Sequence, residues 1–484
     1  MHLKIKIILI AILLAVFTLG ANAKVVLPNF FDNGMVLQQQ TQVGIWGKST
    51  KIANALSITT SWDKKTYSVT IDENGNWKTK LSTPKAGGPF IININDGDEV
   101  TLNDVWIGEV WLVSGQSNME MPVQGFKNQP VLNAAEIFKA ATNKNIRVFR
   151  TIKEAKGLPA NNMKGNWQVA DSAVIRLFSA IGYLFAVQLQ EKLNVPVGVI
   201  QSAWGGTNIS SWMSAESFKD FEKENRYQSK HPDSVKKMDR NVPSALFNGM
   251  INPLMGYGIK GVLWYQGEHN HREPEFYAKV FPVMINDWRT RWGIGNFPFY
   301  YVQLAPNESV KDGENISLSA LFREMQYNAQ FSIPNTGMSV TLDAGEQKVI
   351  HPANKPAVAQ RLAAIALNKT YGFKEVVYAG PSYKNHTING NQLVLNFDNV
   401  VKGLKPFTTP SVNFELAGAD KVFYPAKADI KGNAIVLKSD KVQKPEAARY
   451  GFKMWVVGDL YNVEGLPASS FRTDNWFAPQ YGKK

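Results

Sequence analysis

The sequence predicts an α/β protein in which a central three-layer domain, with helices on both faces of a parallel sheet, lies between two β-rich regions. The length of 484 residues corresponds to about three domains of roughly 150 residues each. Residues 106–370 alternate apolar runs with helical patterns, which is typical of βαβ units. Residues 24–105 and 371–484 contain short β-rich runs separated by turn residues instead.

The first 23 residues predict a cleaved export signal. Lys4 and Lys6 precede the apolar run Ile7–Leu19, and Ala21-Asn22-Ala23 matches the small-x-small cleavage pattern. This run is shorter than the roughly 20 residues that a membrane-spanning helix needs. We therefore expect an exported bacterial protein, periplasmic or extracellular, with no membrane span after cleavage.

Composition excludes several classes of function. The chain has no cysteine, so it has no disulfide, no thiolate zinc site and no cysteine nucleophile. The net charge is +13, but Lys and Arg are scattered, which indicates a basic surface and no nucleic-acid partner. His269 and His271 form an H-x-H pair without an evident third ligand. We expect neither a metal nor an organic cofactor.

Residues 24–105 predict a small β-sandwich. Asn74-Gly75 is a strong hairpin signal, because these residues readily adopt the positive φ of a tight turn. The predicted strands are Gln42–Trp46, Leu56–Trp62, Thr66–Ile71 and Phe90–Ile94.

The central region, residues 106–370, predicts buried parallel strands joined by helices. Residues 217–243 are charged and weakly periodic, and we interpret them as a surface insertion. The predicted strands are Val110–Ser114, Val197–Ser202, Gly261–Tyr265, Phe297–Leu304 and Met338–Leu342. The predicted helices are Ala173–Leu193, Glu275–Trp292, Ser317–Gln330 and Asn354–Lys369.

The last region, residues 371–484, predicts a second β-rich domain. Asn389-Gly390 and Lys431-Gly432 are turn signals. The predicted strands are Leu393–Phe397, Val412–Leu416, Ala434–Leu437 and Ala448–Val456.

Polar side chains follow four of the central strands. Ligands of open α/β sheets bind at the carboxyl ends of the strands, so these loops should share one edge. Together they carry a hydroxyl, glycine amides, amide side chains, carboxylates and an imidazole, which are the groups that acyl transfer needs. The loops are 115–120, 204–208, 266–270 and 343–352.

Ser117 and His351 are the candidate nucleophile and base. Ser117 lies between a strand and a helix start, where its hydroxyl can be exposed, although serine is also an ordinary helix N-cap. Position 119 is Met, so the G-x-S-x-G elbow of α/β-hydrolases is absent. His351 follows the last predicted strand of the sheet, and either Asp343 or Glu346 could orient its ring.

The remaining loop residues are candidates for oxyanion stabilisation and substrate contact. Gly206 could direct its amide at the acyl oxygen, unless the Gly-Gly pair only makes a turn. Gln266 and Asn270 could each add a side-chain donor. Trp204 offers a flat face for a sugar ring, and Glu268 could be a buried hydrogen-bonding residue. The candidate substrate-binding residues are Gln116, Asn118, Trp204 and Glu268.

Five stretches together resemble the sialate O-acetylesterase family, a branch of the SGNH hydrolases. They are WLVSGQSNMEMP, VGVIQSAWGGTNISSWMS, GVLWYQGEHN, DAGEQKVIHPANKPAVAQRLA and GDLYNVEGLPASSFRTD, within residues 111–474. The resemblance implies an SGNH-type three-layer domain and a serine esterase that removes acetyl groups from sugar hydroxyls.

The resemblance also implies the roles of site residues. Ser117 is the implied nucleophile, His351 the base, and the Ser117 amide and Gly206 with Gln266 or Asn270 the oxyanion hole. Many SGNH hydrolases have the acid in a D-x-x-H motif, but this chain has Lys348 at that position. The acid is then Asp343, or the enzyme uses a Ser–His dyad.

Two other interpretations stay open. The acetyl group could lie on xylan or another plant polysaccharide, because related sequences are associated with both substrates. The protein could also be a non-catalytic carbohydrate-binding protein, since both flanking regions are β-rich. The sequence carries no signal for the oligomeric state.

Overall fold

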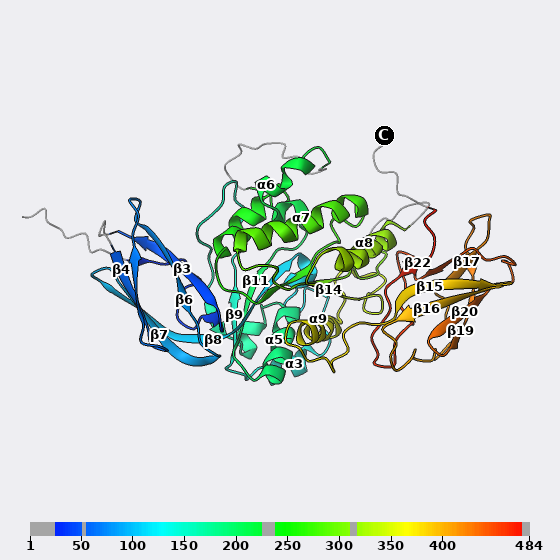
Figure 1. Ribbon diagram of the computed structural model, residues 1–484, viewed down its shortest axis with the longest axis horizontal. Coiled ribbons are helices and arrows are strands. Elements are labelled where there is room, and N and C mark those ends of the chain that lie inside the picture. The colour runs from blue at the N-terminus through cyan, green and yellow to red at the C-terminus, as the bar shows by residue number, and fades with distance from the viewer. Residues whose placement is uncertain (1–24, 51–54, 225–237, 310–316, 477–484) are drawn as a thin grey trace, which may run out of the picture.

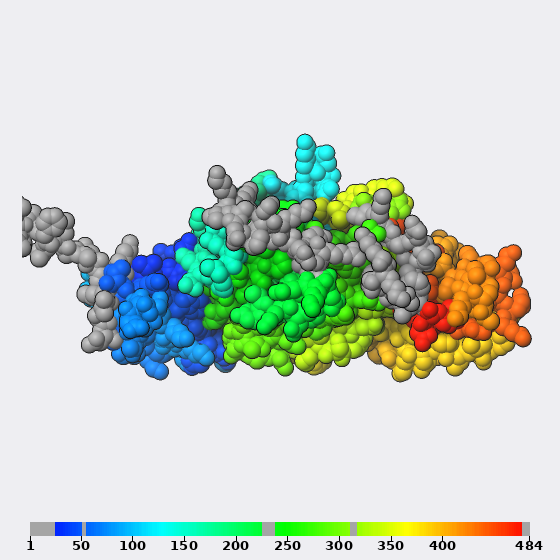
Figure 2. Space-filling view, turned by 90° about the horizontal axis from the view of Figure 1, so that it is seen from above, coloured from blue at the N-terminus to red at the C-terminus, as the bar shows by residue number. Residues whose placement is uncertain are grey.

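The computed structural model describes residues 25–50, 55–224, 238–309 and 317–476. The expected export signal, residues 1–23, lies outside the described residues, as do residues 225–237 of the expected insertion. The three parts of the chain lie in a row, with the α/β part between the two β-rich parts (Figures 1 and 2). No helix in the described ranges combines the length and apolarity that crossing a membrane requires.

The N-terminal part is built from two sheets with alternating buried and exposed side chains. One sheet has the order β1-β3-β6, and the other joins β4, β5 and β7 to the first half of β8. The strands are β1 (Val25–Val26), β2 (Val36–Gln38), β3 (Gln42–Ser49), β4 (Ala55–Thr60), β5 (Thr66–Thr70), β6 (Asn76–Ser82) and β7 (Gly87–Asn95).

Strand β8 (Glu99–Gly115) connects the N-terminal part to the central sheet without interruption. Its first half pairs antiparallel with β7, and its second half pairs parallel with β11 and β12. The expected domain boundary at residue 106 therefore lies inside one continuous strand. Because Ser117 follows this strand by two residues, both sheets support its position.

The central sheet has the order β10-β9-β11-β8-β12-β13-β14. All neighbours are parallel except β10, which pairs antiparallel with β9. We did not predict β2, β9 or β10 from the sequence. The remaining strands are β9 (Ile146–Arg150), β10 (Trp167–Val169), β11 (Val197–Ala203), β12 (Gly261–Tyr265), β13 (Phe299–Val302) and β14 (Thr336–Ser339).

Helices cover both faces of this sheet. In Figure 1, α7 and α8 lie on one side of the strands and α5, α9 and α3 on the other. The long helices are α5 (Ala180–Leu193), α7 (Pro274–Trp292), α8 (Leu318–Ser332) and α9 (Lys355–Lys369). The short ones are α2 (Ser117–Glu120), α3 (Ala134–Ala140), α4 (Ser172–Ile175), α6 (Ala215–Phe218), η1 (Ile209–Trp212), η2 (Lys219–Phe221), η3 (Phe247–Ile251) and η4 (Asn252–Leu254).

The expected helix 173–193 is wrong as one element, because it divides into α4 and α5. Ser179 stands between them and begins α5 by accepting the Gly182 N–H at 3.1 Å. Its hydroxyl also donates to the Met119 carbonyl at 2.6 Å, which fixes the start of α5 against the loop after β8. A long-range contact thus overrides the local helical pattern.

The C-terminal part contains two four-stranded antiparallel sheets around their own apolar core. Their orders are β15-β16-β20-β19 and β18-β17-β21-β22. The strands are β15 (Ser382–Asn389), β16 (Gln392–Asp398), β17 (Phe414–Ala417), β18 (Tyr424–Pro425), β19 (Lys427–Lys431), β20 (Ala434–Lys438), β21 (Ala447–Tyr450) and β22 (Phe471–Arg472). The predicted fold class, α/β with β-rich flanks, is confirmed.

Candidate active site

The four loops expected at one edge of the sheet do meet there. Ser117 follows β8, and Gly205 follows β11, the parallel neighbour of β8. Gln266 follows β12, the neighbour on the other side. His351 comes from the segment between β14 and α9. The carboxyl ends of parallel strands therefore carry the candidate groups, as the βαβ pattern predicts.

Ser117 is the first residue of α2 and faces the imidazole of His351. The N-cap position belongs to Gln116, whose backbone is extended, so the Ser117 hydroxyl does not cap the helix. Its Oγ lies 2.8 Å from His351 Nε2. The turn before it needs glycine, because Gly115 has φ +129° and a Cβ there would lie 2.2 Å from the Tyr265 carbonyl oxygen.

The second ring nitrogen of His351 faces an amide. His351 Nδ1 lies 2.6 Å from Gln129 Oε1, and the Phe126 ring meets the imidazole edge-on at 5.0 Å. A carbonyl oxygen can only accept, so Nδ1 carries the proton and the Nε2 lone pair faces the Ser117 hydroxyl. Burial and then the positive charge of Lys355 lower the pKa of His351 to about 4. The ring is therefore neutral near pH 7 and can accept a proton.

The structure corrects the expectation that Asp343 orients His351. Asp343 binds Arg361 through both carboxylate oxygens, each at 2.7 Å, and accepts from the Tyr461 hydroxyl at 3.2 Å. Arg361 is largely buried, so its charge requires this partner. Glu346, the competing acid, accepts the Ala353 N–H at 2.6 Å. Within the described residues, neither carboxylate contacts the imidazole.

The glycine loop after β11 packs directly against Ser117. A Cβ at Gly205 would lie 2.9 Å from the Ser117 Cβ, so only glycine fits without displacement. The Gly205 amide donates to Glu120 Oε2 at 2.6 Å, which fixes the loop. Gly206, with φ +68°, is the next residue. Its amide and that of Ser117 have no acceptor in the described part of the chain, so both can donate to an oxyanion.

Comparison with known proteins identifies the family of the chain. Residues 107–367, more than half of the chain, match the family described as carbohydrate esterase, sialic acid-specific acetylesterase. The chain belongs to this family of carbohydrate esterases. Human sialate O-acetylesterase is 30% identical over 382 residues, which cover 73% of this chain and 72% of the human protein. The mouse sialate O-acetylesterase is 29% identical over 430 residues, covering 76% and 77%.

A solved structure extends the likeness to the flanking domains. A carbohydrate acetylesterase from Xanthomonas citri superimposes with a TM-score of 0.84 at 35% identity, covering 94% of this chain and 100% of that one. The chain is thus a carbohydrate O-acetylesterase in sequence family and in fold, and the non-catalytic alternative is not favoured.

Gln266 and Asn270 connect two loops of the esterase. Gln266 Nε2 donates to the Thr207 carbonyl at 3.1 Å and to Asn270 Oδ1 at 2.8 Å. Asn270 Nδ2 donates to Glu273 at 3.0 Å, and its Oδ1 accepts the Ile209 N–H at 3.0 Å. Both side chains are buried, and both amide nitrogens are occupied by these contacts. Their role as oxyanion donors stays a prediction.

Three expected substrate-binding residues are buried, so their role in substrate contact stays a prediction. Gln116, Asn118 and Glu268 are at most 6% exposed. Gln116 Oε1 accepts from the backbone amides of Gly267 and His269, at 3.4 and 3.3 Å. Asn118 Nδ2 donates to a carboxylate oxygen of Glu268. Both sets of contacts join the loop after β8 to the loop after β12, so these side chains hold the two loops together.

Two cations that sequence reasoning missed lie near the Trp204 ring. The Lys153 ammonium is 5.9 Å and the Arg240 guanidinium 6.0 Å from the Trp204 ring centroid. A Cβ on Gly206 would be 3.0 Å from Arg240, so this guanidinium lies beside the candidate oxyanion hole. Arg240 belongs to the segment interpreted as a surface insertion, and nothing in its local sequence indicates proximity to the site.

The histidine pair and the remaining polar groups give no metal site. His271 Nδ1 lies 2.9 Å from the Glu268 carbonyl oxygen. In the part of the chain that the structure describes, no three His, Asp or Glu side chains gather where they could hold a metal.

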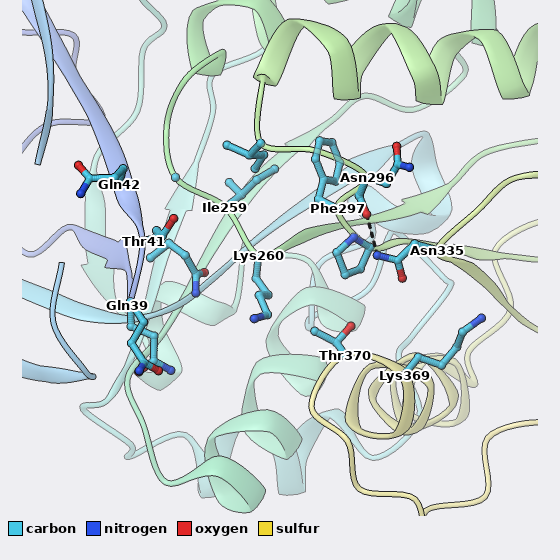
Figure 3. Close-up of a pocket in the computed structure, with 15 residues that line it drawn as sticks. Gln39, Thr41, Gln42, Ile259, Lys260, Asn296, Phe297, Asn335, Lys369 and Thr370 are labelled. Carbon is cyan, nitrogen blue, oxygen red and sulfur yellow. Dashed lines mark hydrogen bonds between the residues drawn. The ribbon is translucent and has the colours of Figure 1, made fainter. Parts of the chain in front are cut away.

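A large cavity of the esterase lies at the opposite edge of the sheet. Its volume is about 450 Å³, and Figure 3 shows its lining. Lys260 precedes β12, Phe297 precedes β13 and Asn335 precedes β14, so the cavity is at the amino ends of the strands. It is therefore separate from Ser117 and His351.

Proposed function

We propose that the esterase works through a serine acetyl-enzyme, with Ser117 as nucleophile and His351 as base. The 2.8 Å contact between Ser117 Oγ and His351 Nε2 carries this proposal. Ser117 Oγ attacks the acetyl carbonyl carbon while His351 Nε2 takes the hydroxyl proton. The amides of Ser117 and Gly206 stabilise the oxyanion, whose negative charge develops on the carbonyl oxygen.

The tetrahedral intermediate then collapses. The bond from the acetyl carbon to the sugar oxygen breaks, and His351 returns its proton to that oxygen, which leaves as a sugar hydroxyl. A water molecule, deprotonated by His351, attacks the acetyl-enzyme. The bond from the acetyl carbon to Ser117 Oγ then breaks, His351 returns the proton to Oγ, and acetate leaves. Gln129 keeps the Nδ1–H tautomer throughout, because its Oε1 accepts that hydrogen.

For the substrate we favour O-acetylated sialic acid. The relatives named sialate O-acetylesterases support this choice. Arg240 beside Trp204 adds a physical reason, since its charge suits a sugar that carries a carboxylate, while Lys153, the other cation, is already paired with Glu120. An acetylated plant polysaccharide such as xylan has no need of this charge.

Acetate release from O-acetylated sialic acid and from acetylated xylan tests both the serine mechanism and the choice of substrate. We expect release from the sialic acid, and a loss of about 10³-fold or more in kcat for Ser117→Ala. Arg240→Gln should raise KM for the sialic acid by about tenfold, as loss of a charged hydrogen bond does, and leave KM for a neutral aryl acetate unchanged. Faster release from xylan would assign the neutral substrate, and unchanged turnover in Ser117→Ala would refute the mechanism.

We also propose that the protein is exported, on the basis of the pattern in residues 1–23. Intact mass of the protein recovered from a bacterial periplasm tests this. We expect a chain that begins at Lys24, and a chain that still begins at Met1 contradicts cleavage.

A further inference from the structure

Lys355 is a buried cation at a position where a cation is unfavourable. It is 1% exposed and is the first residue of α9. The amino end of a helix has partial positive charge, and lysine is rarely buried unless it is paired. Burial lowers the pKa of Lys355 to about 7, opposed by the charges of Glu268 and Glu346. Such a costly placement is typical of functional sites.

The contacts of Lys355 join the loops that carry Ser117 and His351. Its ammonium donates to Asn118 Oδ1 at 2.6 Å and to the Pro352 carbonyl at 2.9 Å. Asn118 directly follows Ser117, and Pro352 directly follows His351. One ammonium group therefore binds the immediate neighbours of both residues of the Ser117–His351 pair.

Asn118 makes the corresponding hydrogen bond to the residue before His351. Its Nδ2 donates to the Ile350 carbonyl at 3.0 Å and to Glu268 Oε1. The two carbonyls that flank His351 are thus both hydrogen-bonded, one by Asn118 and one by Lys355. Glu268 brings in the loop after β12, so three loops of the sheet edge share this buried network.

The Ser117–His351 pair needs such support because no acid among the described residues anchors the imidazole. The partner at His351 Nδ1 is the neutral, half-buried Gln129. A side-chain amide gives a weaker hydrogen bond than a carboxylate. The direction of the ring then depends on how firmly the backbone at 350–352 is placed, and a displacement of about 1 Å can cost about 10²-fold in rate.

We propose that Lys355 is a positioning residue that, through Asn118, holds the His351 loop at the distance from Ser117 that proton transfer requires. This inference rests on the proposed roles of Ser117 and His351. Lys355 is not a catalytic residue, because among the described residues its ammonium hydrogen-bonds Asn118 and Pro352 and neither member of the pair.

The first test is Lys355→Met in the full chain, with an aryl acetate as substrate. We expect kcat to fall by about 10- to 100-fold while KM stays constant, since the binding surface is unchanged. Loss of the Lys355 charge raises the pKa of His351, so the acid limb of the kcat/KM profile should move to higher pH. The matched control is Lys369→Met at the other end of α9, whose ammonium binds the Thr336 carbonyl. It should leave kcat and the acid limb unchanged.

Chemical rescue separates positioning from a purely structural role. The chain has no cysteine, so Lys355→Cys would carry its only thiol. Aminoethylation of this thiol in the denatured state, followed by refolding, restores an ammonium on a side chain of lysine length. Wild type taken through the same steps is the control. We expect the alkylated variant to regain most of the kcat that unmodified Lys355→Cys has lost.

Three results would overturn the inference. The first is a folded Lys355→Met variant whose kcat is within about twofold of wild type. The second is an alkylated and refolded Lys355→Cys variant that is as slow as the unmodified one. The third is that every Lys355 variant fails to fold under conditions in which wild type refolds. The last would assign Lys355 to fold stability alone. Ser117→Ala keeps the two hypotheses apart: if it retains turnover the proposed function fails, and if it loses turnover while Lys355→Met does not, only this inference fails.

Discussion

The two edges of the central sheet differ in how their polar groups are paired. At the amino edge, the cavity of Figure 3 is lined by amides that bind the backbone: Gln38 Oε1 accepts the Val110 N–H at 2.9 Å, and Asn335 Nδ2 donates to the Asn296 carbonyl at 2.7 Å. At the carboxyl edge, two buried acceptors, Gln266 Oε1 and Glu268 Oε2, lack a hydrogen-bond partner among the described residues, whereas near the amino-edge cavity the unpaired buried atom is a donor, Arg289 Nη1.

The two edges also differ in how strongly burial shifts the pKa values of side chains that could act in catalysis. His351 and Lys355, both at the carboxyl edge, have pKa values lowered chiefly by burial, to about 4 and about 7. At the amino edge, burial also lowers the pKa of Lys369, which lines the cavity, but no candidate catalytic residue lies beside it. Native interiors satisfy polar groups almost everywhere, so exceptions indicate function more reliably than an open volume does. The cavity at the amino edge is lined by no candidate catalytic residue and is therefore expected to be chemically quiet, while the carboxyl edge holds Ser117, His351 and the buried Lys355.

The largest effect that should separate the two edges is that of His351→Ala. We expect kcat for an aryl acetate to fall by about 10³-fold or more, because the Ser117 hydroxyl then has no base. Steady-state kinetics on folded protein measures it. A kcat within about tenfold of wild type would show that another group takes the serine proton.

Gln129→Ala should have the next largest effect. Without the amide, nothing in the described chain selects the Nδ1–H tautomer, and the ring loses its 2.6 Å contact. We expect kcat to fall by about 10- to 100-fold with little change in KM, less than for His351→Ala because the base remains. Asn128→Ala, one residue away, is the control. Equal kinetics in both variants would remove Gln129 from the mechanism.

Gln129→Glu should change the pH dependence more than the rate. The pKa of His351 is about 4, so wild-type kcat/KM should stay on its plateau until the pH falls close to 4. A carboxylate at position 129 stabilises the imidazolium and raises this pKa, so the acid limb should move to higher pH. A limb that stays in place would mean that residue 129 does not face the imidazole in solution.

Asp343→Ala should separate stability from catalysis at the same edge. Arg361 would remain buried without its carboxylate, which typically costs about 3 kcal/mol of unfolding free energy. The kcat of the folded variant should stay within about threefold, because Asp343 does not contact His351. Denaturant unfolding and kinetics measure the two quantities. A collapse of kcat with unchanged stability would return Asp343 to the role that the sequence suggested.

The sequence predicted those parts of the site that follow strands. Ser117, Gly206 and His351 were found because parallel strands send their next residues to one edge, whatever the details of the loops. The orientation of Asp343 was not predictable, since it depends on Arg361 in α9 and on Tyr461 in the C-terminal domain.

Sequence reasoning did not identify Gln129 and Lys355 as site residues, for related reasons. Gln129 lies in a loop that no predicted strand precedes, and an amide is not the expected partner of a catalytic imidazole. Lys355 stands at a helix start where a charge-based reading expects an acid. The fold class followed from alternating patterns, whereas the break at Ser179 and the strands β2, β9 and β10 depend on contacts that are distant in sequence.

Substitutions at the amino edge should have the smallest effect on kcat and KM. Thr41 and Lys260 line the cavity of Figure 3, and Lys260 lies 5.5 Å from the Tyr371 ring centroid, a contact worth about 0.5–1 kcal/mol where it is exposed. We expect the double variant Thr41→Ala, Lys260→Ala to keep kcat and KM within about twofold on both the aryl acetate and O-acetylated sialic acid. If KM for the sugar rises while KM for the aryl acetate does not, the cavity holds part of the substrate, and the contrast between a quiet and a reactive edge is wrong.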